Sequence, residues 1–109
     1  MATFEDFLKI DIRIGTVLSA ELNEKAVKPA YILTINFGVA GIKQSSAQIT
    51  ENYSPEQLLG RQIAAVVNFP PKQIADVISE VLILGVMVGS SGVVLLSPES
   101  HVPDGTVVA

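Results

Sequence analysis

The sequence predicts an all-β fold, a five-stranded Greek-key barrel with a short N-terminal helix and a C-terminal extension. The first reason is the alternation of apolar and polar residues from Ile10 to Thr16, which is typical of a strand buried on one face. The second is that short turns rich in Gly, Pro and Asn separate the apolar segments. The third is size, because 109 residues form one compact domain, residues 1–109, with a single core. A β-sandwich fits the same pattern about equally well.

The first residues predict a short helix over 3–8. Thr3 followed by Asp6 resembles a capping box, and Phe4, Phe7 and Leu8 then lie at helical spacing. Two exposed phenylalanine rings would be costly in water. We expect them to cover one end of the barrel or to meet a second subunit.

The next segments predict a hairpin and a third strand. Residues 23–29 are polar and form the hairpin loop, and residues 30–38 form the second strand. Gly38 and Gly41 mark the following turn, and residues 42–50 form the third strand. The face of the second strand that is expected to be buried carries Tyr31, Leu33, Ile35 and Phe37.

A single helical turn is predicted before the fourth strand. Ser54 caps it, Pro55 takes the first helical position, Gln57 completes a capping box and Gly60 ends it.

Two nearly continuous apolar segments, residues 61–69 and 80–88, predict strands buried on both faces. Residues 92–98 add a terminal strand, and residues 103–108 add a turn and a short edge strand. The loop between the two apolar strands contains Pro70 and Pro71. Since proline fixes φ and lacks a backbone donor, we expect a stiff loop that loses little entropy when a ligand docks on it.

Composition excludes several classes of protein. There is no cysteine, so disulfides and thiolate metal sites are excluded, and the formal charge of −4 disfavours long-range attraction to nucleic acid. The start lacks the basic and apolar segments of a secretion signal. The most apolar stretch, residues 81–89, is much shorter than the roughly 20 residues of a membrane span. A cytoplasmic location is expected.

Catalysis is not predicted. The lone histidine, His101, lies in a proline-flanked tail, and neither Ser45 nor Ser46 has an identifiable base. No phosphate-binding glycine loop is present, and no carboxylates have the spacing of a metal site. We expect a protein that is not an enzyme and has no cofactor or metal.

Binding has more residues to support it. Residues 43–48 carry a series of hydrogen-bond donors that includes Lys43 and Ser45, and Asn68 and Lys72 bracket the proline pair. These side chains, with Pro70, predict one wall of a binding surface.

Three segments carry a resemblance to a known family. They are "DIRIGTVLSAE", "GIKQSSAQITENYSPEQLLGRQIAAVVNFPPKQIADVISEVLILG" and "VVLLSPESHVPDGTVV", which together cover nearly the whole chain. They resemble the CsaA family of export-associated chaperones, which is similar to the tRNA-binding domain at the C-terminus of bacterial methionyl-tRNA synthetases. The combination of "KQSSAQIT" with "VVNFPP" is the most specific part of the match.

The resemblance implies a barrel of the oligonucleotide/oligosaccharide-binding (OB) class that acts as a homodimer through terminal elements, here Phe4, Phe7 and Leu8. It implies an ATP-independent chaperone that binds unfolded or export-destined polypeptides, and the alternative is a structure-selective tRNA-binding protein. The tRNA-domain motif implies contacts at Asn68, Lys72 and Ser79, with Lys43 nearby. We therefore expect the ligand contacts to be Lys43, Ser45, Asn68, Pro70, Lys72 and Ser79.

Acidic residues beside this surface favour polypeptide over tRNA. Asp76 and Glu80 follow the predicted contact Lys72, where RNA-binding relatives commonly have a basic or glycine-bearing segment. Together with the net charge of −4, they predict that polypeptide binding outranks tRNA binding at physiological salt.

Overall fold

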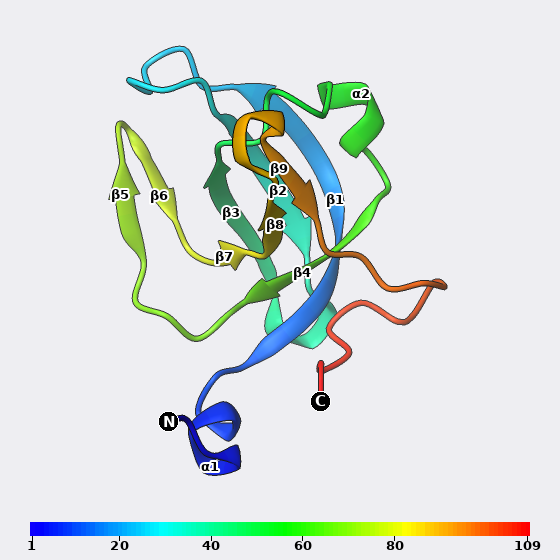
Figure 1. The fold of residues 1–109 in the computed structure, drawn as a ribbon. Coiled ribbons are helices and arrows are strands. Elements are labelled where there is room, and N and C mark those ends of the chain that lie inside the picture. The colour runs from blue at the N-terminus through cyan, green and yellow to red at the C-terminus, as the bar shows by residue number, and fades with distance from the viewer.

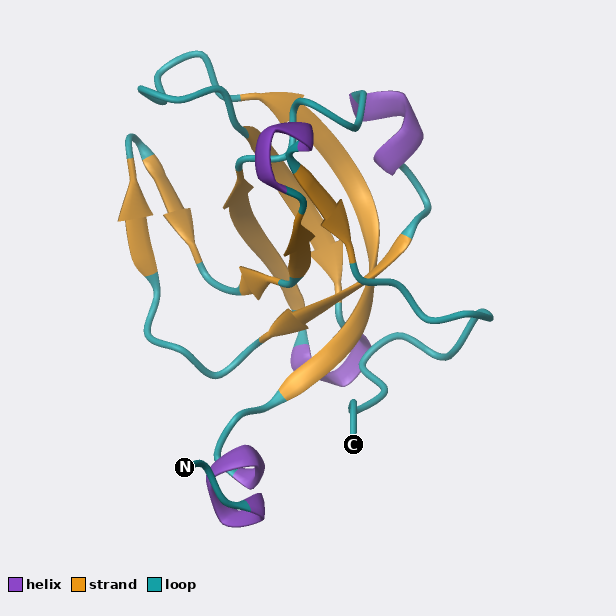
Figure 2. Cartoon of the chain, in the orientation of Figure 1, coloured by secondary structure: helices purple, strands orange, loops and turns teal.

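An antiparallel barrel forms the body of the molecule, with short helices at its margins (Figures 1 and 2). The computed structural model describes residues 1–109. Five strands form one sheet in the order β3-β2-β1-β4-β7, and every neighbouring pair is antiparallel. The predicted barrel is therefore confirmed, and the sandwich alternative is rejected. The strands are β1 (Ile12–Leu22), β2 (Tyr31–Asn36), β3 (Ile42–Ala47), β4 (Gln62–Val66) and β7 (Leu82–Ile83).

The core is mostly aliphatic and centres on strand β2. Tyr31, Leu33, Ile35 and Phe37 are all buried on one face of this strand, as predicted. Strand β4 is buried along its whole length, also as predicted. The predicted helical turn is α2 (Pro55–Leu58), which has the expected capping box and whose Leu58 is fully buried in the core cluster.

The alternating residues of the first strand, which include Ile14 and Thr16, do not lie on the face of the strand that lines the barrel. Gly15 lies against Ile35 and Phe37, which leave no room for a side chain there, and Val17 follows it into the core. Ile14 is buried but lies outside the core cluster, and Thr16 donates a hydrogen bond to Asp104 at 2.6 Å. The C-terminal extension thus packs on the face that carries the alternating residues. Its predicted edge strand is reduced to a single bridge between Arg13 and Val107.

The prediction of one long, doubly buried strand over 80–88 is wrong. The chain forms the short strand β7, passes through Leu84, whose N–H still donates to Ala64 O of β4 at 2.9 Å, and then forms β8 (Gly85–Met87). Strand β8 pairs with β9 (Val93–Leu95) in a separate hairpin, joined by the 3-10 turn Gly89–Ser91. Val86 and Met87 are exposed there, by 51% and 85%.

The loop predicted between the two apolar strands contains a second hairpin. Strand β5 (Lys72–Ile74) pairs with β6 (Val77–Ser79), and Ala75 begins the two-residue turn with φ +55°. Glycine or asparagine is the usual residue in such a turn, so the turn could not be predicted from the sequence. The hairpin stands beside the barrel (Figure 1).

The barrel closes between β3 and the segment that follows β6. Glu80 N–H donates to Gln44 O at 2.8 Å, and the Gln44 N–H donates to the Glu80 carboxylate at 3.0 Å. The bond from Glu80 N–H to Gln44 O is the one main-chain bond across the seam, and side chains supply the other hydrogen bonds.

Helix α1 (Phe4–Leu8) projects from the lower end of the barrel in Figure 1. The predicted capping box between Thr3 and Asp6 is present, and no residue of the helix is buried. The helix therefore does not cover the barrel of its own subunit. No helix in the structure is both long enough and apolar enough to cross a membrane.

Candidate binding cavity

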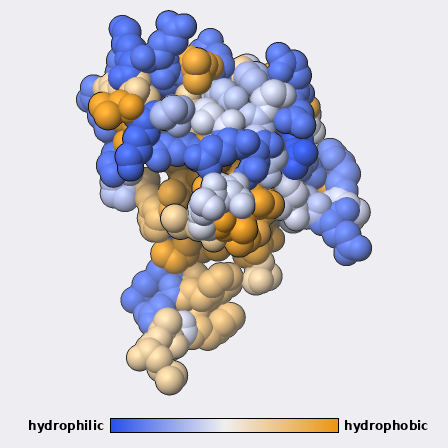
Figure 3. Space-filling view, turned by 45° about the horizontal axis from the view of Figure 1, so that its top comes forward, coloured by the Kyte–Doolittle hydropathy of each residue, from blue (hydrophilic) through white to orange (hydrophobic).

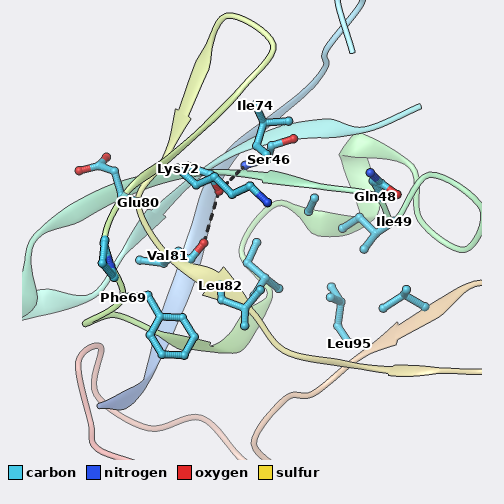
Figure 4. Close-up of a pocket in the computed structure, with 15 residues that line it drawn as sticks. Ser46, Gln48, Ile49, Phe69, Lys72, Ile74, Glu80, Val81, Leu82 and Leu95 are labelled. Carbon is cyan, nitrogen blue, oxygen red and sulfur yellow. Dashed lines mark hydrogen bonds between the residues drawn. The ribbon is translucent and has the colours of Figure 1, made fainter. Parts of the chain in front are cut away.

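An open cavity of about 370 Å³ lies between the end of β3, the β5–β6 hairpin and the β7–β9 region (Figure 4). Aliphatic side chains form most of its floor, and Phe69 lies at one end close to Leu82. Such a concave, apolar surface suits an apolar ligand group. The apolar lining includes Ala47, Ile49, Phe69, Val81, Leu82 and Leu95.

One cation stands over this apolar floor. Lys72, on β5, is exposed and makes no ion pair, and in Figure 4 its side chain extends toward Gln48. Ser79, its cross-strand partner on β6, also lines the cavity, and so does Pro70. Three of the predicted contacts, Pro70, Lys72 and Ser79, are therefore brought together at one cavity.

Lys43 lies at the edge of this arrangement and does not line the cavity. Its ammonium group is 4.0 Å from the Glu80 carboxylate, and both side chains are about one third exposed. Asp76 is likewise paired with Lys25 at 3.4 Å. Because Glu80 and Asp76 both have lysine partners, they repel anions less than was expected from the sequence.

Ser45 occupies a structural position instead of the predicted contact position. It is 1% exposed, and its Oγ lies 3.1 Å from both the Val81 carbonyl and the Ser79 Oγ. The Ser46 N–H donates to the same Ser79 Oγ at 3.2 Å. These bonds join β3 to the end of β6 and to Val81 just after it, so Ser45 closes the barrel seam and is not accessible to a ligand in this structure.

Asn68 is also separate from the cavity. Its Oδ1 accepts from the Asp11 N–H at 2.9 Å, and its Nδ2 donates to the Lys9 carbonyl at 2.8 Å. The side-chain amide is thus bonded to the segment that leads from α1 into β1. The sequence predicted that Asn68 and Lys72 form one wall of a binding surface. In the structure the two side chains do not lie on one wall.

Phe69 is the main cavity residue that was not predicted from the sequence. It is 42% exposed and stands between Asn68 and Pro70. An aromatic residue at the end of a strand predicted to be fully buried, directly before two prolines, was a signal that could have identified it.

The five-stranded antiparallel barrel, with the short helix α2 between β3 and β4, is of the OB class. A family model described as "Putative tRNA binding domain" matches residues 12–107, and the chain belongs to that family. Two solved structures of similar proteins are described as CsaA chaperones. One, from Bacillus anthracis, is 56% identical, with a TM-score of 0.95 over 100% of this chain and 99% of that one. The other, from Picrophilus torridus, is 51% identical, with a TM-score of 0.93 over the whole of both chains.

Similarity also extends to one part of much longer proteins. The methionine–tRNA ligase of Methanococcoides burtonii is 36% identical over 108 residues, which is 99% of this chain but 16% of that protein. The corresponding share of the Flavobacterium johnsoniae ligase is 14%. The chain therefore spans only about one sixth of the length of these ligases or less.

Proposed function

We propose that the chain is an ATP-independent chaperone that binds unfolded or export-destined polypeptides as a homodimer. The open aliphatic cavity with the unpaired Lys72 at its rim is the observation that carries this proposal. Unfolded segments expose apolar side chains that a folded protein buries, and the cavity offers such side chains an aliphatic surface. The chaperones of similar structure from Bacillus anthracis and Picrophilus torridus support the same function.

The cavity sets the expected strength of binding. Full burial of one Leu- or Phe-sized side chain contributes about 1.5–3 kcal/mol, so two anchors contribute about 3–6 kcal/mol. That corresponds to a Kd no tighter than about tens of micromolar for one cavity. Weak binding lets a client leave without nucleotide hydrolysis. Two cavities of a dimer on one client would raise the affinity through effective concentration.

The projecting helix supports the homodimer. Phe4 and Leu8 are 73% and 64% exposed, and Phe7 packs on Phe4 with ring centroids 6.5 Å apart. Figure 3 shows apolar surface on this helix and on the adjacent end of the barrel. A five-residue helix is too short to be stable alone in water, and a second copy of the chain would bury its rings.

tRNA binding is the second candidate function, and the family match supports it. The unpaired Lys72 could contact a phosphate, and Arg61, which lies over the Tyr53 ring at 5.2 Å, is a second exposed cation. If each subunit neutralises two or three phosphates, log K should fall with log salt with a slope of about −3 to −6. Since the net charge is −4, we rank tRNA below polypeptide at physiological salt.

A direct comparison tests the ranking. A labelled unfolded polypeptide and labelled tRNA would each be titrated with the protein at about 0.15 M ionic strength, where the Debye length is about 8 Å. We expect the polypeptide to bind more tightly and to keep most of its affinity as salt increases. Tighter tRNA binding at this salt would refute the chaperone proposal as the main function.

A further inference from the structure

The candidate cavity does not end at the β5–β6 hairpin. A second groove of about 460 Å³ lies between the hairpin and the β1–β2 loop, and Gln48 and Ile74 line both this groove and the cavity. The two compartments are therefore neighbours that share one boundary. Figure 1 shows the hairpin with its tip close to the β1–β2 loop, where Lys25 pairs with Asp76.

The two compartments differ in chemistry. Apolar residues form the larger part of both linings, and the difference lies in the charged residues. The cavity is lined by Lys72 and Glu80, whereas the second groove is lined by Lys25 and Lys28. No acidic residue lines the second groove. Lys28 is exposed and makes no ion pair, as is true of Lys72 in the cavity.

We propose that the cavity and the second groove together bind an extended polypeptide in which an apolar anchor is accompanied by acidic residues. The apolar side chain would fill the cavity, and the acidic side chains would meet Lys72 and then Lys28 beyond the Gln48–Ile74 boundary. This inference rests on the proposed chaperone function and adds a preference among its clients. Charge complementarity supports it, because the unpaired cations along this path outnumber the unpaired acids that line it.

A polypeptide fits this path better than single-stranded RNA. Proteins that bind single-stranded nucleic acid without sequence preference do so largely by stacking its bases on aromatic side chains. No aromatic residue lines the second groove, and Phe69 is the one aromatic residue that lines the cavity. An extended peptide requires only an apolar side chain and carboxylates at successive positions.

The preference can be measured with labelled peptides that share one apolar anchor and carry acidic, neutral or basic flanks. Exposed ion pairs contribute little, so two lysines should make the acidic peptide bind about 3- to 10-fold more tightly than the neutral one. The difference should disappear at about 1 M salt, where the Debye length is about 3 Å, while binding of the apolar anchor persists.

Lys28→Ala should reduce the preference for acidic flanks without weakening binding of the neutral peptide. Arg61→Ala is the matched control, because it removes the same charge from a residue that lines neither compartment. Equal loss in both variants would show a general charge effect and overturn the inference. Tighter binding of a short single-stranded RNA that depends on Lys28 would overturn it as well.

The outcomes separate this inference from the proposed function. If all three peptides bind equally, the client preference is wrong and the chaperone function stands. If no apolar peptide binds, the proposed function itself fails. Circular dichroism of both variants checks that each one keeps the fold.

Discussion

Asn68 fixes the position of Asp11 through its side-chain amide. The Asp11 N–H donates to Asn68 Oδ1 at 2.9 Å, and the Asn68 Nδ2 donates to the Lys9 carbonyl at 2.8 Å. The Val67 N–H also donates to the Asp11 carbonyl at 2.8 Å. Residues 67 and 68, directly after β4, therefore orient the segment that carries helix α1, which is the element proposed to form the dimer.

Asn68→Ala should loosen this segment. Each lost hydrogen bond contributes about 0.5–1.5 kcal/mol in general, and exposure places these two toward the lower value. Amide exchange at Asp11 should become faster, and the dimer should weaken, while peptide binding to the cavity stays unchanged. If the variant loses ligand affinity and Asp11 exchanges at the original rate, then Asn68 contacts the ligand directly.

The proposed dimer and ligand surfaces can be separated by two substitutions. Phe7→Ala should increase the dimer dissociation constant, because it removes one of the two stacked rings of α1. Lys72→Ala should leave the dimer intact and weaken binding of acidic ligands. Sedimentation velocity and a peptide titration on both variants measure the two effects. The opposite pattern would mean that the surfaces are exchanged, and a wild-type protein of single-chain mass at micromolar concentration would reject the dimer.

Local signals predicted part of this fold correctly. The capping boxes of Thr3 and Ser54 and the alternation in residues 31–37 act over a few residues, so the sequence alone identified them. The β5–β6 hairpin has strands of three residues and Ala75 in its turn, so it gave no local signal. The continuous apolar stretch over 80–88 has no period that could reveal its division into β7 and β8.

The candidate site was predicted only in part for a related reason. Lys72 and Ser79 are paired across the hairpin, so both reach the same cavity. Ser45 and Asn68 are close in sequence to residues that line the cavity, but each donates a hydrogen bond to a carbonyl distant in sequence. Ser45 donates to Val81 and Asn68 donates to Lys9. Residue type indicates what a side chain can bond, whereas only the tertiary structure determines which partner it bonds.

Ser45→Ala should destabilise the barrel at its seam. The buried Oγ lies within bonding distance of Val81 O and Ser79 Oγ, and loss of a buried hydrogen bond costs about 1–3 kcal/mol. Urea unfolding measures the loss. Ser79→Ala should cost less, because Ser79 is only half-buried. An unchanged urea midpoint for Ser45→Ala would show that the seam does not depend on this hydroxyl.

Gly15→Ala should destabilise the barrel by overpacking. An added Cβ would lie 2.7 Å from both Ile35 Cγ2 and Phe37 Cδ1, which belong to fully buried side chains. Such overpacking costs about 1–3 kcal/mol, and thermal unfolding should show it. Gly60→Ala is the comparison, because its Cβ would meet no atom within 4 Å and only the φ of +78° opposes it. A larger loss at Gly60 than at Gly15 would contradict this packing argument.

Acid should weaken helix α1 only at low pH. The hydrogen bonds from the backbone and side chain of Thr3, together with the nearby Lys9, hold the pKa of Asp6 below its ordinary value of 3.8. Because the folded pKa is the lower one, the carboxylate stabilises the helix above pH 3.8, and this contribution is lost as the pH falls from 3.8 through the lowered pKa. An NMR titration of the Asp6 carboxyl carbon measures the shift. Asp6→Asn should remove the acid dependence, because an amide oxygen can still accept from the Thr3 N–H.

The carboxylate of Asp6 remains ionised near neutral pH, so the proposed dimer should not respond to pH through Asp6 in that range. A dimer that dissociates between about pH 6 and 7 would require a different titrating group.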